Sequence, residues 1–167
     1  MDSLIYVGLG IVAVLIIAII IIGRLKDPTI FSPYKKKPLL TKPEMVMLSK
    51  IQRAIEGSGL YVSSQVSMGA LINLKRNVDS KQRMGLRNRF NRKIVDFVIV
   101  GQSGMGLILI ELDDTSHSPI KDAERDSMTR SAGYHTIRYK SARGTKIEQI
   151  REDIFSVLQT HKITRKD

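Results

Sequence analysis

Two apolar segments joined by a glycine-rich turn constrain the fold of this chain more than any other feature of its sequence. Residues 94–100 and 107–112 have the length and the aliphatic content of strands, and the Ser103-Gly104 pair between them suits a tight hairpin turn. The second segment opens with four consecutive apolar residues, a pattern typical of a strand that is buried on both faces. The sequence therefore predicts a hairpin whose second strand lies inside a covered sheet.

The predicted hairpin brings three carboxylates together on one face. A turn centred on Ser103-Gly104 places Asp96 directly opposite Glu111, and Asp113 shares the face of Glu111 because strand side chains alternate. Crowded carboxylates destabilise a sheet unless a cation neutralises them, and a hard divalent cation with oxygen ligands is the usual partner. We therefore expect a metal site at Asp96, Glu111 and Asp113. The competing interpretation is a solvated edge with scattered acidic residues.

The N-terminal segment predicts a membrane anchor. Nineteen residues without a charge begin at Leu4 and end at Ile22, and as a helix they would span about 28 Å, close to the roughly 30 Å hydrocarbon core of a bilayer. A cleaved signal peptide would have a basic start and a shorter apolar core, whereas this chain starts with Asp2 and continues into Arg24. Residues 1–24 are thus expected to form an uncleaved single-pass anchor, with the N-terminus outside and the remaining chain in the cytoplasm.

The charge of the chain favours a polyanionic partner. The net charge of +11 comes from the chain beyond the anchor, and it suits either nucleic acid or an anionic lipid surface. Residues 25–38 form a linker whose three prolines prevent a regular helix. This linker also carries a lysine triplet that either contacts anionic head groups or serves only as a spacer: Lys35, Lys36 and Lys37. The absence of cysteine excludes disulfides and thiolate metal sites.

Residues 75–93 form a strongly basic run. With Gly85 and three asparagines among its residues, the run predicts a loop. Because it leads directly into the carboxylate hairpin, it either holds a phosphate backbone near the acids or is a solvated charged face. The residues expected to contact nucleic acid are Lys75, Arg76, Arg83, Arg87, Arg89, Arg92 and Lys93.

Shorter signals complete an α/β domain over residues 39–160, followed by a polar tail over residues 161–167. Thr41 and Glu44 have the spacing of a capping box that opens a helix. Glu44 is expected to cap that helix, and a contribution to the acidic site is the lesser alternative. The order from there is helix, strand, strand, strand, helix and strand, with a closing helix. The strands are expected at residues 60–66, 94–100, 107–112 and 134–139, and the helix between the last two at residues 118–132.

The motifs of this domain resemble a known family. In order along the chain they are Val95-Asp96-Phe97, Ile110-Glu111-Leu112-Asp113-Asp114, His117, Arg125-Asp126, Ala132-Gly133 and Ile137-Arg138-Tyr139. They resemble the bacterial family catalogued as domain of unknown function 2726, which is placed with the restriction-endonuclease-like PD-(D/E)xK superfamily, near the very-short-patch-repair-like nucleases. The resemblance covers roughly residues 39–139. It implies an αβββαβ core with a mixed central sheet flanked by helices, and metal-dependent cleavage of phosphodiesters.

The resemblance also implies roles for single residues. Asp96 matches the aspartate of the superfamily motif and Glu111 its acidic ligand, so these two would hold Mg²⁺, with Asp113 as a further ligand. Asp113 stands where the superfamily usually has a lysine that orients the attacking water. The polar or cationic function would then come from His117, Lys121 or Arg125, and His117 is the expected proton-transfer group. The catalytic set expected from sequence is Asp96, Glu111, Asp113 and His117.

These observations predict a nuclease-like domain on the cytoplasmic side of the bacterial inner membrane. Its partner would be nucleic acid, with DNA as the expected kind. Two alternatives stay open. One is a catalytically inactive relative that binds nucleic acid or a partner at the membrane. The other is a membrane-surface scaffold whose positive charge binds only lipids.

Overall fold

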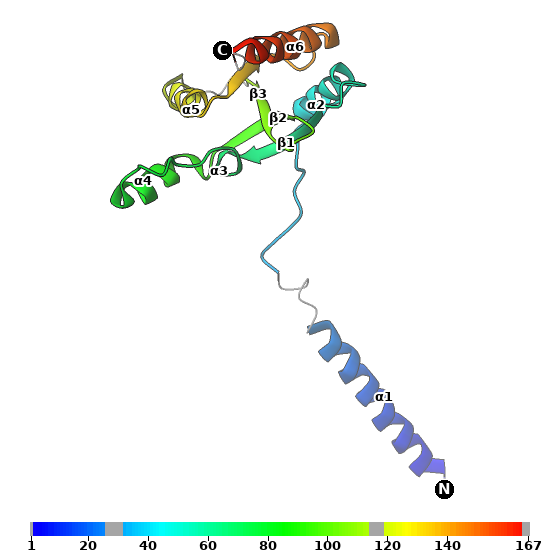
Figure 1. The fold of residues 1–167 in the computed structure, drawn as a ribbon. Coiled ribbons are helices and arrows are strands. Elements are labelled where there is room, and N and C mark those ends of the chain that lie inside the picture. Colours follow the sequence, from blue (N-terminus) through cyan, green and yellow to red (C-terminus); the bar gives the residue numbers. More distant parts are fainter. Residues whose placement is uncertain (1, 26–31, 114–118, 165–167) are drawn as a thin grey trace. The chain divides into compact units, whose positions relative to one another are not determined.

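The computed structural model describes residues 2–25, 32–113 and 119–164. The chain divides into two compact units, Met1–Pro38 and Leu39–Asp167 (Figure 1). The helices are α1 (Asp2–Leu25), α2 (Lys42–Ala54), α3 (Met68–Leu71), α4 (Ser80–Phe90), α5 (Pro119–Ser131) and α6 (Ile147–Thr164). The strands are β1 (Tyr61–Ser67), β2 (Ile94–Val100), β3 (Gly106–Leu112) and β4 (His135–Tyr139).

Helix α1 is long and apolar enough to cross a membrane. The segment that meets both criteria, Ser3–Arg24, contains the whole uncharged run of the predicted anchor, from Leu4 to Ile22. Its large aliphatic side chains are exposed within their unit, as expected for a helix whose neighbours would be lipid tails. The location in the bacterial inner membrane, with the N-terminus outside, stays a prediction.

The second unit is built on a four-stranded mixed sheet with the strand order β1-β2-β3-β4. Strands β1, β2 and β3 pair antiparallel, and β3 pairs parallel to β4. Strand β3 therefore has a neighbour on each side, and its residues Ile108, Leu109 and Ile110 are at most 1% exposed. This confirms both the buried second strand of the hairpin and the α/β class with a mixed sheet.

The β2–β3 hairpin has the predicted register from Phe97 to Ile99 but not next to the turn. Phe97 pairs with Ile110, as a turn centred on Ser103-Gly104 predicts, whereas the register shifts between Ile99 and Val100, and Val100 pairs with Gly106 instead of Leu107. Gly104 lies in the turn with a φ of 78°, a left-handed conformation that glycine adopts without steric cost. Continuing the register by one residue from the Phe97 pair brings Asp96 opposite Glu111.

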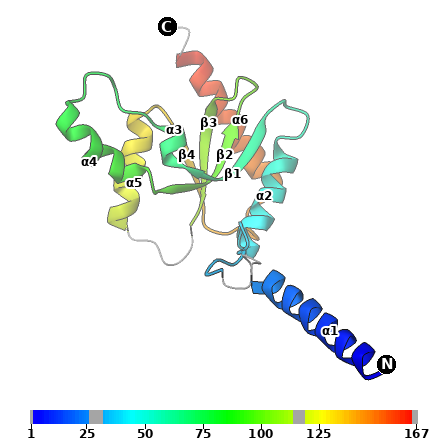
Figure 2. The ribbon, with the colours of Figure 1, turned by 90° about the horizontal axis from the view of Figure 1, so that it is seen from below.

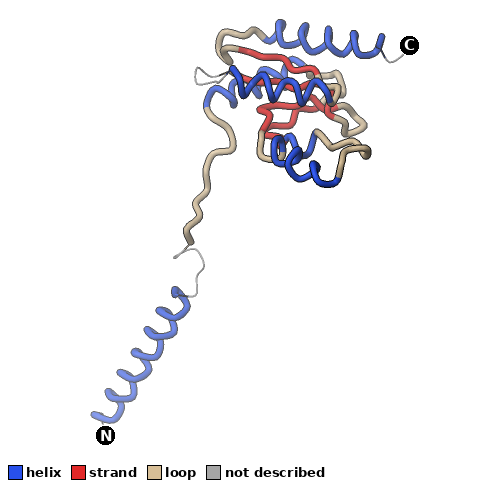
Figure 3. Tube along the Cα trace, turned by 90° about the vertical axis from the view of Figure 1, so that its left-hand side faces the viewer, coloured by secondary structure: helices blue, strands red, loops and turns tan. Residues whose placement is uncertain are grey.

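Helices cover both faces of the sheet, as Figure 3 shows in the layering of helices and strands. Figure 2 shows α2 and α6 on one side of the sheet and α4 and α5 on the other. The core beneath α2 and α6 contains Met47, Ile51, Phe97, Ile99, Ile108, Ile110, Ile150 and Ile154. The core on the other face contains Met68, Phe90, Val95, Val98 and Leu109, with Met128 of α5 packed against it. By alternation along β3, Glu111 shares the face of Leu109 and so points to the α5 side.

Residues 75–93 are not the continuous loop that the sequence predicted, because Ser80–Phe90 form helix α4. Asp79 caps this helix by accepting a hydrogen bond from the backbone N–H of Lys81 at 2.8 Å. At the other end, Phe90 is 4% exposed and anchors the helix in the second core. The helix is thus held at its two ends, without the apolar stripe that sequence periodicity detects. The expected αβββαβ order is present with two additional helices, α3 and α4, between β1 and β2.

Helix α2 begins with the predicted capping box. The Oγ1 atom of Thr41 accepts a hydrogen bond from the N–H of Glu44 at 3.4 Å, and the Glu44 carboxylate accepts one from the N–H of Thr41. Pro43 occupies the first turn, where a missing N–H leaves no helical hydrogen bond unmade. Further along, Met47 is fully buried and fixes the helix against the sheet. As a result, the first turn of α2 lies beside the end of β2 that carries Asp96.

Candidate functional site

A cavity of about 620 Å³ lies at the edge of the sheet where β3 ends. Its walls come from the start of α2, from β2 and β3, from α5, and from the connection between β4 and α6. The acidic residues that line it are Glu44, Asp96, Glu111 and Asp113. The basic residues that line it are Lys42, Arg125, Lys140 and Arg143. The structure therefore brings the three predicted carboxylates of the hairpin to one cavity and adds a fourth from α2.

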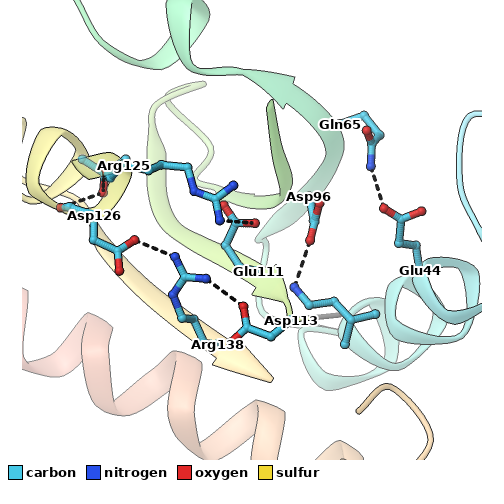
Figure 4. A network of polar contacts seen from close by, with 10 residues as sticks. Glu44, Gln65, Asp96, Glu111, Asp113, Arg125, Asp126 and Arg138 are labelled. Carbon is cyan, nitrogen blue, oxygen red and sulfur yellow. Dashed lines mark hydrogen bonds and ion pairs between the residues drawn. The ribbon is translucent and has the colours of Figure 1, made fainter. Parts of the chain in front are cut away.

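Asp96 and Glu111 are adjacent in this cavity (Figure 4). The Oδ2 atom of Asp96 accepts a hydrogen bond from the backbone N–H of Leu112 at 2.9 Å, which holds the carboxylate over the end of β3. Glu111 is 4% exposed, and its Oε2 atom lies 3.5 Å from the Nη2 atom of Arg125. The charge of Asp96 raises the pKa of Glu111, and the side chain of Glu111 in turn affects the pKa of Asp96. The two carboxyl groups therefore interact directly, as the hairpin register requires.

The pKa of Asp96 is raised above its ordinary value. The largest cause is burial, which disfavours the charged carboxylate. The hydrogen bond from Leu112 lowers the pKa, whereas the negative charge of Glu44 raises it. The positive charge of Arg125 and the interaction with the Glu111 side chain lower it further but do not outweigh the burial. The protein therefore stabilises the ionised form of Asp96 only in part.

Glu111 is perturbed more strongly. Burial raises its pKa to about 8, although the positive charge of Arg125 opposes the change, and the neighbouring Asp96 raises the pKa further. With a pKa of about 8, Glu111 therefore retains its proton at neutral pH. A divalent cation between the two carboxyls would favour loss of that proton, because metal ligands must be deprotonated. Strongly perturbed neighbouring acids in a cavity are typical of functional sites.

Arg138 on β4 joins the end of the hairpin to α5. Its Nη1 atom donates to Oδ1 of Asp113 at 2.8 Å, and its Nη2 atom donates to Oδ1 of Asp126 at 2.6 Å. Burial alone would lower the pKa of Arg138, but the hydrogen bonds with Asp126 and Asp113 outweigh it and raise the pKa above its ordinary value. The backbone N–H of Asp113 also donates to the carbonyl of Tyr139 at 2.9 Å. Asp113 is therefore fixed by β4 through both its backbone and its side chain.

Glu44 and Gln65 belong to the same network. The sequence gave Glu44 a contribution to the site only as the lesser alternative, and it gave Gln65 none. The carboxylate of Glu44 accepts a hydrogen bond from the Nε2 atom of Gln65 at 2.9 Å. Gln65 lies inside β1 with a φ of 54°, and it is the only residue other than glycine with positive φ among those the structure describes. Its neighbours Ser64 and Val66 pair with Phe97 and Val95, so the irregular residue of β1 lies beside Asp96. Backbone strain of this kind concentrates at functional sites.

The strain at Gln65 gives a prediction for stability. We expect Gln65→Gly to unfold with a free energy about 1 kcal/mol higher than Gln65→Ala, because only glycine adopts this φ without a steric cost. At an ordinary strand position the order is reversed, and alanine is the more stable. Both variants lose the hydrogen bond to Glu44, so their difference reports the backbone alone. Urea unfolding followed by circular dichroism measures it, and an alanine variant as stable as the glycine variant would show that Gln65 is unstrained.

The candidate ligands for Mg²⁺ in the cavity are carboxylate oxygens. Among the residues that the structure describes, no three His, Cys, Asp or Glu side chains are arranged to hold a metal ion. Asp113 is engaged by Arg138, which leaves Asp96 and Glu111 as adjacent oxygen donors. Mg²⁺ is usually held by one or two carboxylates together with water and substrate phosphate. Two adjacent carboxyls are therefore available as ligands, and both Mg²⁺ at this site and Asp113 as a third ligand stay predictions.

The residues predicted to contact nucleic acid lie away from this cavity. None of the described residues that line it comes from the basic run. Arg83 donates to the backbone carbonyl of Lys75 at 3.2 Å, and Lys93 forms an ion pair with Glu124 at 3.3 Å. Among the residues predicted to contact nucleic acid, the exposed ones are Lys75, Arg76, Arg87, Arg89 and Arg92. Their contact with nucleic acid stays a prediction.

The predicted proton-transfer group, His117, lies outside the described residues, and so does the side chain of Lys121. Arg125 is the one candidate of the three for which the structure gives a position. It lines the cavity from α5, and its guanidinium approaches Glu111. A positive charge therefore stands beside the carboxyl group of Glu111.

The fold and cavity define an α/β domain with a buried acidic site at the edge of a mixed four-stranded sheet. The chain matches the model of the family described as "Protein of unknown function (DUF2726)" over residues 36–158, and it belongs to that family. It is 30% identical over 108 residues to an uncharacterized protein of Haemophilus influenzae (strain ATCC 51907 / DSM 11121 / KW20 / Rd). That match covers 64% of this chain and 53% of the relative, so the chain spans about half the length of the relative. No solved structure matches the chain significantly.

Proposed function

We propose that the cavity is the active site of a membrane-anchored, metal-dependent nuclease-like domain that cleaves nucleic-acid phosphodiesters. The observation that carries the proposal is the pair of Asp96 and Glu111. These carboxyls are adjacent and line an open cavity. Nearby positive charge does not offset their burial, so the two do not both ionise at neutral pH. The resemblance of the family motifs to the restriction-endonuclease-like superfamily supports the same function.

The residues of the site have separable roles in this proposal. Bound Mg²⁺ would polarise the scissile phosphate and lower the pKa of the attacking water. Asp96 and Glu111 bind and orient the cation, and the N–H of Leu112 keeps the Asp96 carboxylate in place. Arg125 brings positive charge to Glu111, in a site where Asp113 stands at the position of the superfamily lysine. His117 is proposed for proton transfer.

A second candidate function is binding without cleavage. Two ion pairs favour it, because Arg125 with Glu111 and Arg138 with Asp113 partly neutralise the acids without a metal. The lysine of the superfamily motif is also absent. A module of this kind would hold nucleic acid or a protein partner at the membrane. It predicts binding that needs no divalent cation and that survives neutralisation of Asp96 or Glu111.

Cleavage assays separate the two functions. The full chain in a non-ionic detergent is incubated with supercoiled plasmid, and in parallel with an RNA oligonucleotide, with Mg²⁺ or with a chelator. We expect Mg²⁺-dependent cleavage that falls about a hundredfold or more in Asp96→Asn and in Glu111→Gln, because a catalytic metal supplies several kcal/mol and each 1.4 kcal/mol is a factor of ten. Gel analysis of the products measures the rates.

The matched control is Glu56→Gln, which removes one exposed carboxylate beyond the end of α2 and leaves the cavity unchanged. This variant should cleave at the rate of the unmodified chain. Equal cleavage by the Asp96 and Glu111 variants would remove the site assignment. Binding without any Mg²⁺-dependent cleavage would establish the second function in place of the first.

A further inference from the structure

Three basic side chains line the carboxylate cavity from segments that the sequence did not connect with it. Lys42 lies in the first turn of α2, and Lys140 and Arg143 lie in the connection between β4 and α6. All three residues are exposed, whereas Glu111 in the same cavity is buried. The cavity therefore combines buried and half-buried acids with three exposed cations, which we call the basic rim (Lys42, Lys140 and Arg143).

The connection that carries two of these cations is held by a specific device. The Nζ atom of Lys50, on α2, donates to the backbone carbonyls of Ala142, Arg143 and Thr145 at 2.8, 3.1 and 2.6 Å. Within the connection, the N–H and the hydroxyl of Thr145 both donate to the carbonyl of Ser141. The ammonium group of Lys50 thus binds three backbone carbonyls of the connection. Hydrogen bonds from a charged donor are the stronger kind, so the connection is a fixed platform for Lys140 and Arg143.

The basic rim and the basic helix α4 lie on different sides of the sheet. Figure 2 shows α4 beside α5, whereas α2 lies on the opposite side. A phosphate backbone that passes over Asp96 and Glu111 would meet the basic rim directly, because the rim and the acids line one cavity. The exposed cations of α4 would meet the same polymer only farther from the cavity.

We propose that Lys42, Lys140 and Arg143 form a phosphate-binding surface that holds the backbone of a nucleic-acid duplex at the mouth of the carboxylate cavity. The proposal rests on the proposed function, because it assigns the substrate contacts of that same site. Phosphates repeat along a nucleic-acid strand, so neighbouring ones reach the rim while one phosphodiester lies over the carboxyls. A lipid surface presents its phosphates in a plane and gains nothing from acids in a cavity behind the cations.

The test is the binding of a fluorescent DNA duplex, two helical turns long, to the full chain in a non-ionic detergent with a chelator present. The variant is Lys140→Gln with Arg143→Gln, which removes two exposed cations. We expect affinity to fall about tenfold, and the slope of log K against log salt to become shallower by about 1.8, since each phosphate contact contributes about 0.9. Fluorescence anisotropy over a salt series measures both quantities.

The matched control is Arg53→Gln with Arg130→Gln, which removes two exposed cations away from the cavity. Its salt slope should remain that of the unmodified chain, and an equal loss in variant and control would overturn the proposal. Duplex binding that is unchanged, with lost binding to a short-chain anionic phospholipid, would assign the rim to the membrane and overturn it as well. An unmodified chain that binds no nucleic acid, with or without Mg²⁺, would remove the proposed function itself.

Discussion

Glu111→Gln is expected to raise the free energy of unfolding by about 3 kcal/mol near pH 8 in the absence of divalent cations, while it abolishes cleavage. The physical reason is the burial of a carboxyl that the protein supports poorly once it is ionised. Glutamine has nearly the same shape and fills the same space without a charge. A substitution that stabilises the fold and removes the activity is the signature of a residue kept for function.

The sign of this effect follows from the pKa values. Below the ordinary value of 4.5, Glu111 is protonated in both the folded and the unfolded chain, so the substitution has little electrostatic effect. Between 4.5 and about 8 the unfolded chain releases the proton and the folded chain retains it. Stability of the unmodified protein therefore falls as the pH rises through this window, by up to about 1.4 kcal/mol per pH unit. Above about 8 both states are ionised and the dependence ends.

Urea unfolding of the full chain in a non-ionic detergent, followed by circular dichroism near pH 4.5 and near pH 8, measures the difference. Glu56→Gln is again the control, because its carboxylate is exposed, and it should not show the same growth in stability with pH. Adding Mg²⁺ near pH 8 should stabilise the unmodified chain more than Glu111→Gln, since ligand binding to the folded state adds to its stability. A variant less stable than the unmodified chain near pH 8 would mean that Glu111 is ionised and paired with Arg125.

The part of the site that lies on the β2–β3 hairpin was predictable from the sequence. The turn pair at Ser103-Gly104 fixes the register of a hairpin, and the register fixes which residues are opposite each other. Counting from that turn brought Asp96 and Glu111 together, and the structure has the counted register at Phe97, although a shift between Ile99 and Val100 separates these pairs from the turn. The buried run at the start of β3 likewise indicated a central strand, and β3 lies between β2 and β4.

The remaining half of the site depends on contacts between segments that are far apart in the sequence. Glu44 was predicted as a helix cap and does cap α2, but its position beside Asp96 results from how that helix packs on the sheet. The strained φ of Gln65 leaves no mark in composition or periodicity. Lys140 and Arg143 are ordinary surface cations until Lys50 fixes their connection against α2.

Helix α4 shows the limit of periodicity for the fold itself. Its sequence has no apolar stripe, and Gly85 within it disfavours a helix. The cap at Asp79 and the burial of Phe90 at its end replace the usual continuous apolar face. A helix that is stabilised at its ends is not detected by a search for an apolar face with helical periodicity.

Arg138→Met is expected to lower the free energy of unfolding by about 2 kcal/mol, because two partly buried aspartates lose their partner. The side chains of Arg138, Asp113 and Asp126 are 24%, 30% and 31% exposed, so solvent screens the ion pairs in part and the loss stays below that of a fully buried pair. A double-mutant cycle with Asp126→Asn should give a coupling energy of about 1 kcal/mol. Urea unfolding of the four proteins measures it.

The same variant tests the role of Asp113 in the chemistry. If Asp96 and Glu111 alone carry the cation, the Mg²⁺ concentration for half-maximal cleavage is unchanged in Arg138→Met, and only stability falls. If Asp113 is a third ligand, its release from Arg138 makes the cation bind more tightly, and the half-maximal concentration decreases. Arg53→Met, in which the replaced cation is exposed, should change neither quantity. A coupling energy near zero would show that the Arg138 pairs contribute nothing to the fold, and Asp113 would then be positioned by its backbone hydrogen bond to Tyr139 alone.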